Sequence, residues 1–285
     1  MSLPAVVILA HANPQHVRRL VAALRPLPIF LHVDAATPTD VFTTMVDGLP
    51  DTVRLLPRRR TGWASYALVE AELSGYRAAL AETDADHLVL CTGADYPLAG
   101  VEQIAGTLEG YAGLSWMELD ELPIRDWGPL WGYDRFLWRN QVRDRSRQWS
   151  PIPRPWPKGL RPAGGSQLKI LARHHARRLL AVLDERPDLV TYFREVWVPD
   201  ETMVPTLLSS PFTGVDLPDE SVPGPPPWYI DWGAKPSPSP RWLGGDDLPA
   251  LVGARLRSSP ALFARKFDES ATDVLDAIDA QLRCR

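Results

Sequence analysis

Short apolar runs alternate with helical patterns through the first half of the chain, and this alternation constrains the fold more than any other feature. The runs at 5–10, 29–33 and 87–91 have the length of strands, and the stretches 15–24 and 67–80 repeat apolar residues at helical spacing. Strands that are apolar at every position are typical of a parallel sheet with both faces covered. The sequence therefore predicts an α/β fold with a mostly parallel sheet flanked by helices.

Polar residues follow each of these three strands. His11 follows the first, Asp34 the second, and Asp95 comes shortly after the third. Sheets of this kind bind their ligands at the carboxyl ends of the strands. We therefore expect these side chains to meet in one cleft.

Length and charge exclude several classes of protein. A chain of 285 residues with 45% hydrophobic residues can bury its own core, and its net charge of −4 gives no electrostatic footprint for nucleic acid. The apolar run at 5–10 is too short for a signal or membrane segment. We expect a cytoplasmic protein with no nucleic-acid partner and no stable membrane insertion.

The two cysteines, Cys91 and Cys284, lie far apart and lack metal-ligand partners at a suitable spacing. This predicts neither a disulfide framework nor a structural zinc site. Because Cys91 lies within an apolar run, we interpret it as a packed small hydrophobe and not as a nucleophile.

The region from 122 to 162 has no regular period and is rich in Trp, Arg and Pro. It is too aromatic for disorder and too rich in Pro for continuous helix, so we interpret it as an ordered insertion over a binding site. A loop that merely closes the core explains the composition equally well. Because aromatic faces suit sugar rings, Trp131 is a candidate acceptor contact, as is Trp232, which ends a predicted buried strand at 228–232.

Two adjacent cations, Arg265 and Lys266, stand between Phe263 and Phe267, ahead of a helix-like stretch that runs to Arg285. Permanent charge in an apolar setting costs desolvation energy unless an anion compensates it, which makes the pair a candidate anion site. The alternative is a snorkelling pair on the face of a terminal helix, with both aromatic rings in the core.

Several common catalytic signatures are missing. The sequence has no phosphate-binding Gly-x-x-x-x-Gly-Lys-Ser/Thr loop, no Gly-x-Gly-x-x-Gly after the first strand, no Gly-x-Ser-x-Gly elbow and no His-Glu-x-x-His helix. The Asp-x-Asp that holds a metal against a sugar nucleotide is also missing, because Asp34 is followed by Ala35 and Ala36. Asp200 and Glu201 follow a proline at a predicted helix start, where they either cap the helix or point into a cleft.

Eight short segments form a further pattern: Ile-Leu-Ala-His-Ala-Asn-Pro at 8–14, Leu-His-Val-Asp at 31–34, Gly-Trp-Ala-Ser at 62–65, Thr-Gly-Ala-Asp-Tyr-Pro-Leu at 92–98, Gly-Gly-Ser at 164–166, Pro-Asp-Glu at 199–201, Tyr-Ile-Asp-Trp at 229–232 and Leu-Phe-Ala-Arg-Lys-Phe at 262–267. In order and identity they resemble the core-2/I-branching β-1,6-N-acetylglucosaminyltransferase family, which includes the peptide O-xylosyltransferases. The resemblance covers nearly the whole chain except 122–162.

The resemblance implies a GT-A type fold, a UDP-sugar donor, inversion at the anomeric carbon, and no metal or other cofactor. It predicts a single glycosyltransferase domain over 1–285. Within it we expect a nucleotide-binding half at 1–121, the Trp-rich insertion at 122–162, and an acceptor and catalytic half at 163–285 with a diphosphate-binding tail.

The resemblance also assigns binding residues. Lys266 matches the family's diphosphate-binding lysine, and Arg265 and Arg241 are candidates for a second cation, because without a metal basic side chains must offset the charge on departing UDP. The residues that fall where the family contacts the uridine half of the donor are His11, Asp34, Trp63 and Ser65. Glu118 falls near an acceptor-binding carboxylate of the family.

An inverting transfer needs a base that takes the proton of the acceptor hydroxyl. Glu201 matches the glutamate with this role in the N-acetylglucosaminyl branch of the family. The xylosyl branch instead places an aspartate after Gly-Gly-Ser, where this chain has Gln167. The resemblance therefore indicates Glu201 as the base, with Asp200, Glu118 and Asp95 as the next candidates.

The chain departs from the vertebrate members of the family, which are membrane-anchored secretory enzymes with several disulfides. We expect a bacterial, cytoplasmic enzyme whose acceptor is a saccharide or another small hydroxyl-bearing molecule. UDP-N-acetylglucosamine, UDP-glucose and UDP-xylose stay open as donors. The main alternative is a non-catalytic nucleotide- or carbohydrate-binding protein on the same fold, and a glycoside hydrolase with paired carboxylates is the third.

Overall fold

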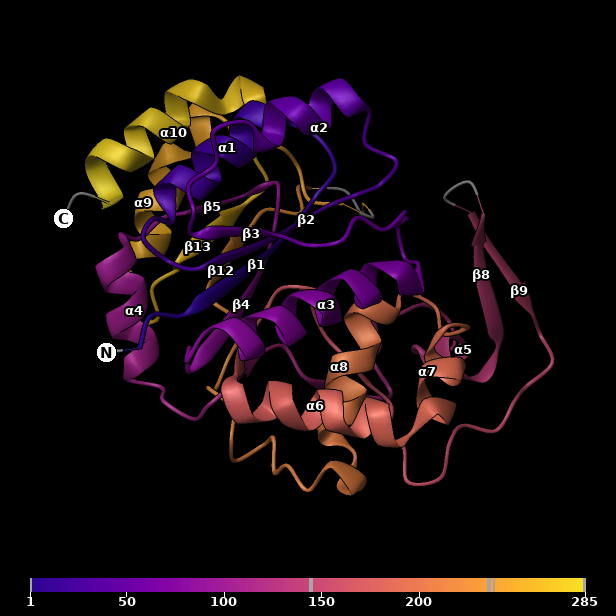
Figure 1. Cartoon of the computed structure of the whole chain (residues 1–285). Helices are drawn as coiled ribbons and strands as arrows, with labels where there is room; N and C mark the ends of the chain where they lie inside the picture. The colour runs from indigo at the N-terminus through magenta and orange to yellow at the C-terminus, as the bar shows by residue number, and fades with distance from the viewer. Residues whose placement is uncertain (1, 144–145, 235–236, 238, 284–285) are drawn as a thin grey trace.

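The computed structural model describes residues 2–143, 146–234, 237 and 239–283, and its centre is a sheet of six strands (Figure 1). The strand order is β3 (Val53–Leu55), β2 (Ile29–Val33), β1 (Ala5–Ala10), β4 (His87–Thr92), β11 (Lys169–Ala172) and β6 (Trp116–Met117). The first four are parallel, whereas β11 is antiparallel to both of its neighbours. This parallel-rich sheet confirms the predicted fold class.

The sheet topology brings four strand ends to one edge. Two antiparallel steps, from β4 to β11 and from β11 to β6, make β6 run in the same direction as β4. In register, Ala10 at the end of β1 pairs with Val33 at the end of β2, and Leu9 pairs with Thr92 at the end of β4. The carboxyl ends of β1, β2, β4 and β6 therefore lie along the same edge.

Both faces of the sheet are covered by helices, as the unbroken apolar strands predict. Along β1, Val6 and Ile8 belong to one hydrophobic core and Val7 and Leu9 to the other. The first core is covered by α1 (Pro14–Ala23), α2 (Thr39–Val46), α4 (Val101–Glu109), α9 (Leu248–Arg255) and α10 (Thr272–Ile278). The second is covered by α3 (Tyr66–Glu82), α6 (Arg173–Glu185), α7 (Pro187–Phe193) and α8 (Pro199–Ser209). In Figure 1 the first set lies above or to the left of the sheet and the second below it.

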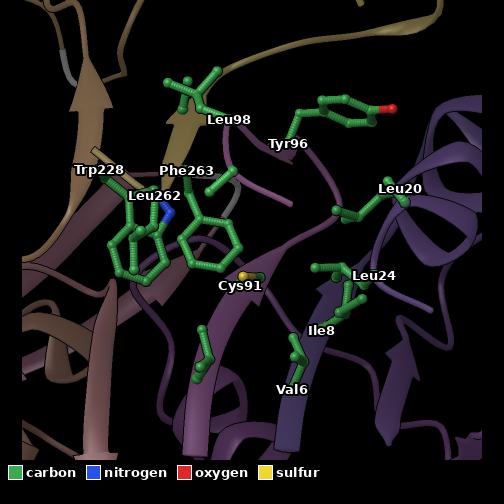
Figure 2. Packing of buried hydrophobic residues seen from close by; sticks show 14 of the residues in the cluster. Val6, Ile8, Leu20, Leu24, Cys91, Tyr96, Leu98, Trp228, Leu262 and Phe263 are labelled. Carbon is green, nitrogen blue, oxygen red and sulfur yellow. The ribbon is translucent and has the colours of Figure 1, made fainter. Parts of the chain in front are cut away.

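The C-terminal part of the chain packs into the first core through a small sheet of β12 (Trp228–Ile230), β13 (Phe263–Arg265) and β5 (Asp95–Pro97). The Trp228 and Phe263 rings stack with centroids 4.8 Å apart, and Cys91 lies beside them (Figure 2). Cys91 is fully buried and unbonded, which confirms it as a packed apolar residue.

The pair Arg265 and Lys266 does not lie on a terminal helix, so that alternative is wrong. Arg265 ends β13 and Lys266 follows it, while Phe263 and Phe267 are fully buried as expected. Phe263 and Arg265 are two residues apart and so share one side of the strand; Phe263 is fully buried, whereas the Arg265 side chain at the strand end stays 18% exposed. The helix-like stretch forms η3 (Glu269–Ala271), α10 and a π-helical turn, η4 (Asp279–Arg283). Cys284 and Arg285 lie outside the described residues.

The predicted strand at 228–232 is shorter than expected. It ends at Ile230, only Trp228 is buried, and Trp232 is 52% exposed beyond the strand. The strand stops where β13, the strand it pairs with, ends at Arg265 opposite Ile230.

The Trp-rich region contains helix α5 (Tyr133–Leu137) and a hairpin of β8 (Arg139–Arg143) and β9 (Ser146–Ser150). The hairpin projects from the body of the molecule in Figure 1. On either side of the region, β7 (Asp120–Glu121) pairs with β10 (Ala163–Gly164), which closes its base. Short 3-10 turns complete the fold: η1 (Pro211–Thr213) and η2 (Gly245–Asp247). No helix in the described part of the chain has the length and apolar character needed to cross a membrane.

Candidate active site

Predicted site residues follow the strands that end at the shared edge of the sheet. His11 comes directly after β1, Asp34 after β2 and Glu118 after β6, and Thr92 is the last residue of β4. Parallel strands direct the loops at their carboxyl ends toward one crevice. The remaining candidates are connected to this edge by the contacts described below.

The Asp34 carboxylate is fully engaged by backbone and side-chain donors. Its Oδ1 accepts from the Ala36 amide at 2.6 Å, and its Oδ2 accepts from the Thr61 amide at 3.1 Å and from the Thr61 hydroxyl. The His11 carbonyl accepts from the Thr37 hydroxyl at 3.0 Å. These bonds fix the loops after β1, β2 and β3 against one another.

The Thr61 loop continues to Trp63, whose side chain is 45% exposed. Trp63 meets Trp197 edge-on, with ring centroids 5.3 Å apart and an angle of 82° between the planes. The Trp197 amide donates to the Arg135 carbonyl at 3.0 Å. Trp63 is therefore linked through Trp197 to helix α5.

Ser65, at the start of α3, accepts a hydrogen bond from the Gly62 amide at 3.1 Å. It also lines a cavity of about 260 Å³ between α3 and the hairpin strand β8. Asn140, Gln141 and Arg194 contribute polar groups to the same cavity. Amide and guanidinium side chains of this kind hydrogen-bond well to hydroxyl-rich ligands.

Glu201 lies in the first turn of α8, where the helix dipole favours negative charge. Its Oε2 accepts from Arg135 Nη1 at 3.0 Å, and the Glu201 side chain remains 35% exposed. The Arg135 guanidinium lies 3.5 Å from the centre of the Trp127 ring, so the arginine is held between the ring and the carboxylate. Burial lowers the pKa of Arg135, and the nearby Glu201 charge opposes that shift.

Two glycines allow these groups to approach each other. A Cβ at Gly164 would lie 1.8 Å from the Trp127 ring, and one at Gly165 would lie 2.1 Å from the Glu118 carbonyl oxygen. The Gly165 amide donates to the Glu201 carbonyl at 3.0 Å. Close backbone approach therefore explains both glycines, and it places Glu118 beside Glu201.

Glu118 lies in a setting that disfavours its charge. Burial raises the pKa of Glu118, and the negative charges of Asp120 and Glu201 raise it further. A carboxyl group next to a second, exposed carboxylate is suited to binding a hydroxyl group as a hydrogen-bond partner.

A buried polar network lies beneath Glu201. Lys169 Nζ, with its side chain fully buried, lies 3.1 Å from Glu72 Oε1 and donates to the Asp200 carbonyl at 3.4 Å. The Tyr76 hydroxyl donates to the same Glu72 oxygen at 3.0 Å. Burial and the Glu201 charge raise the pKa of Asp200 to about 7. The network connects β11, α3 and the first turn of α8, which fixes the backbone that carries Glu201.

The cations of the C-terminal segment lie near the end of β4. Arg265 Nη1 donates to Thr92 Oγ1 at 3.0 Å and lies 3.5 Å from Asp95 Oδ1, so its charge is partly compensated. Burial raises the pKa of Asp95 to about 6, and Arg265 opposes this. Lys266 Nζ donates to Ser239 Oγ at 2.6 Å.

Lys266 is the cation with the least compensation. Its Nζ lies 4.2 Å from the centre of the Trp242 ring, and no carboxylate in the described part of the chain forms an ion pair with it. Partial burial lowers the pKa of Lys266, and the neighbouring Arg265 lowers it further. A bound anion next to Lys266 would offset both the burial and the repulsion by Arg265. Lys266 is therefore well suited to bind an anion.

Arg241, the other candidate cation, is already paired. Its Nε donates to Asp231 Oδ2 at 2.8 Å, and its Nη1 donates to Asp247 Oδ2 at 3.0 Å. The Arg241 amide also donates to the Asp231 carbonyl at 3.0 Å, which closes the base of the loop that contains Trp232. Trp232 thus belongs to the loop that Lys266 contacts through Ser239. Trp131 is also exposed, and it precedes Arg135, the partner of Glu201, by four residues.

The sequence model of the Core-2/I-branching enzymes matches residues 26–244, most of the chain. The chain belongs to the Core-2/I-branching enzyme family. Members of this family are glycosyltransferases with a GT-A-like fold, and this Core-2/I-branching enzyme has the corresponding architecture. The matched range contains Asp34, Glu118 and Glu201 and ends before Arg265 and Lys266.

Two solved structures with a distant similarity to this family member illustrate the fold comparison. One, described as a glucose-1-phosphate thymidylyltransferase from Bacillus anthracis in complex with sucrose, has 10% identity and a TM-score of 0.32, covering 62% of this chain and 74% of its own. HddC from Yersinia pseudotuberculosis has 10% identity and a TM-score of 0.31, covering 62% of this chain and 79% of its own. None of the curated proteins compared with the sequence matches it.

Sequence reasoning missed three residues of the site. Arg135 and Trp127 lie in a region without periodicity, where nothing in the sequence connects them to Glu201. Lys169 was hidden because it stands in the apolar run that forms β11. A lysine at a strand position buried on both sides is itself a signal, because such a charge requires a buried partner.

Proposed function

We propose that this Core-2/I-branching enzyme moves a sugar from a UDP-sugar to a hydroxyl of a small-molecule or saccharide acceptor, with inversion and without a metal ion. The observation that carries the proposal is Glu201, a partly exposed carboxylate held by Arg135 beside Glu118, on the sheet edge that also carries Lys266. The uridine half of the donor is assigned to His11, Asp34, Trp63 and Ser65.

Glu201 is the base of the proposed reaction. Arg135 holds Oε2, while Oε1 makes no hydrogen bond to any described residue and can accept from an acceptor hydroxyl. As the acceptor oxygen attacks the anomeric carbon, its proton passes to Glu201 and the bond from that carbon to the UDP oxygen breaks. Attack on the face opposite the leaving group inverts the configuration.

Lys266 stabilises the leaving group in place of a metal. The departing UDP gains negative charge on its diphosphate, and a preorganised cation beside it lowers the barrier. Asp34 is a poor metal ligand because Ala36 and Thr61 donate to its two oxygens. Arg265 is the second cation we assign to the diphosphate, because Arg241 is held by two carboxylates.

The acceptor site is assigned to Glu118, Trp131 and Trp232. Trp131 and Trp232 both offer exposed aromatic faces. Both faces suit a hydroxyl-bearing small molecule or saccharide. UDP-N-acetylglucosamine, UDP-glucose and UDP-xylose are the donors to test, in a bacterial and cytoplasmic setting.

Replacing Lys266 by Ala tests the diphosphate assignment. We expect UDP binding and turnover to fall together, by about 2 to 4 kcal/mol in transition-state terms, as for the loss of one preorganised electrostatic contact. UDP affinity is measured by calorimetry and turnover by UDP release. Arg257→Ala, which removes an exposed cation that has no role in the proposed site, should leave both unchanged. A Lys266→Ala variant with normal UDP affinity would disprove the assignment.

A further inference from the structure

Two histidines and a glutamate lie close together at the edge of the sheet opposite the candidate active site. His174 and His175 lie in the first turn of α6, directly after β11. Ala172, the last residue of β11, pairs with His87 at the amino end of β4. The cluster therefore lies at the edge where β4 begins, whereas the site residues follow the edge where β4 ends.

The three side chains point their potential ligand atoms at one place. Nε2 of His174 lies 3.0 Å from Oε2 of Glu220, and Nε2 of His175 lies 2.9 Å from the same oxygen. The two imidazole rings have centroids 4.0 Å apart at an angle of 47°. All three ligand atoms lie within 4.8 Å of one another.

The far sides of His175 and Glu220 are held in place. His175 is fully buried, and its Nδ1 lies 2.7 Å from the Ser115 hydroxyl, which also accepts from the Ala172 amide at 2.9 Å. The Asp216 amide donates to Oε1 of Glu220 at 3.3 Å, which turns Oε2 toward the histidines. A hydrogen bond to the second ring nitrogen of a histidine is the usual support of a metal ligand.

The backbone around Glu220 is fixed to the same serine. The Ser115 amide donates to the Glu220 carbonyl at 3.0 Å, and the Val222 amide donates to the Ser115 carbonyl at 2.8 Å. Ser115 thus holds both the ligand histidine and the loop that carries the carboxylate. The cluster is preorganised by buried hydrogen bonds, unlike a chance meeting of surface side chains.

We propose that His174, His175 and Glu220 form a site for a divalent transition metal of the zinc class, with water in the fourth position. Two imidazoles and one carboxylate suit zinc and disfavour magnesium or calcium, which prefer oxygen ligands. Zinc ligands of this kind lie about 2.0 to 2.2 Å from the metal, so tetrahedral neighbours stand roughly 3.4 Å apart. The observed separations of 2.9 and 3.0 Å need to widen by only a few tenths of an ångström.

The metal would join α6 to the loop at 216–222 and stabilise this edge of the molecule. It has no part in the proposed sugar transfer, since the site lies at the other end of the strands. In binding zinc, His175 carries its proton on Nδ1 and donates it to Ser115, which leaves Nε2 free for the metal. Without a metal, the two rings instead donate from Nε2 to Glu220, and this is the competing explanation.

The test is zinc binding by the full chain after treatment with a chelator and its removal. Competition with a chromophoric zinc chelator should show one equivalent bound by the wild type, and added magnesium should not displace it. His174→Ala and Glu220→Gln should weaken binding at least tenfold; both side chains are partly exposed, at 53% and 37%, so folding should survive. Asp219→Asn, which removes the exposed charge next to Glu220, is the matched control and should bind normally.

A second readout is thermal stability. Zinc should raise the melting temperature of the wild type and of Asp219→Asn. The melting temperature of Glu220→Gln should stay unchanged, because a ligand stabilises a protein only if it binds the folded state. Equal zinc affinity in the wild type, His174→Ala and Glu220→Gln would overturn the proposal. So would a loss in Asp219→Asn as large as that in Glu220→Gln.

Discussion

Turnover of the Glu201→Gln variant is expected to fall roughly 100-fold to 10,000-fold, the usual contribution of a positioned general base. Glutamine keeps the size of the side chain and an oxygen for Arg135 Nη1, but it cannot take the acceptor proton. UDP-sugar binding should therefore stay within a few-fold of the wild type. Steady-state turnover and calorimetric donor binding, measured on the same preparation, check both halves of this result.

The competing role for Glu201 is capping of α8, and it predicts a different outcome. Loss of one charge near a helix N-terminus costs only about 0.3 to 1 kcal/mol of stability and leaves the chemistry nearly intact. Gln167→Ala is the control, because the xylosyl branch of the family would place its carboxylate at that position. A folded Glu201→Gln enzyme with near-normal turnover would move the search for the base to Asp200, Glu118 or Asp95.

The second large effect is expected in the buried network beneath the site. Lys169→Ala should lower the free energy of unfolding by about 3 to 5 kcal/mol, because Glu72 would keep a buried charge without its partner. Both side chains are almost completely buried, at 0% and 1% exposure, so water cannot replace the lost ion pair. Urea unfolding followed by circular dichroism measures the change.

Lys158→Ala provides the matched control for this stability measurement. Lys158 is exposed, and its removal should change the free energy of unfolding by less than about 0.5 kcal/mol. If Lys169→Ala lowered the free energy of unfolding no more than Lys158→Ala, the buried pair would not stabilise the native fold. Other contacts would then hold α8 in position.

The fold was predictable because the strongest signals in the sequence are local. In β1 every residue is apolar and buried, and the same holds for β2 apart from His32, so strand, sheet type and two-sided covering all follow from short segments. Cys91 was predictable for the same reason, since its neighbours are apolar throughout. His11 and Asp34 could be placed at one edge because each follows a strand of the same direction.

The contacts within the site join segments that are far apart in the sequence. The local pattern of apolar and polar residues therefore cannot predict them. Arg135 meets Glu201 across 66 residues of chain, and Lys169 meets Glu72 across 97. Arg265 and Lys266 stand out in the sequence as adjacent cations, yet the choice between helix and strand depends on the pairing of β13 with β5. Arg241 shows the same limit, because its two carboxylate partners were not evident from spacing.

The most direct test of the central claim is UDP release by the purified chain, supplied with each candidate UDP-sugar in excess EDTA. We predict slow hydrolysis of one preferred donor, acceleration by a hydroxyl-bearing acceptor, and loss of that acceleration in Glu201→Gln. EDTA would also remove metal from the His174, His175 and Glu220 cluster, so the assay is run well below the melting temperature of the metal-free protein. No UDP release from any donor, or activity that EDTA abolishes and manganese restores, would contradict a metal-independent UDP-sugar transferase.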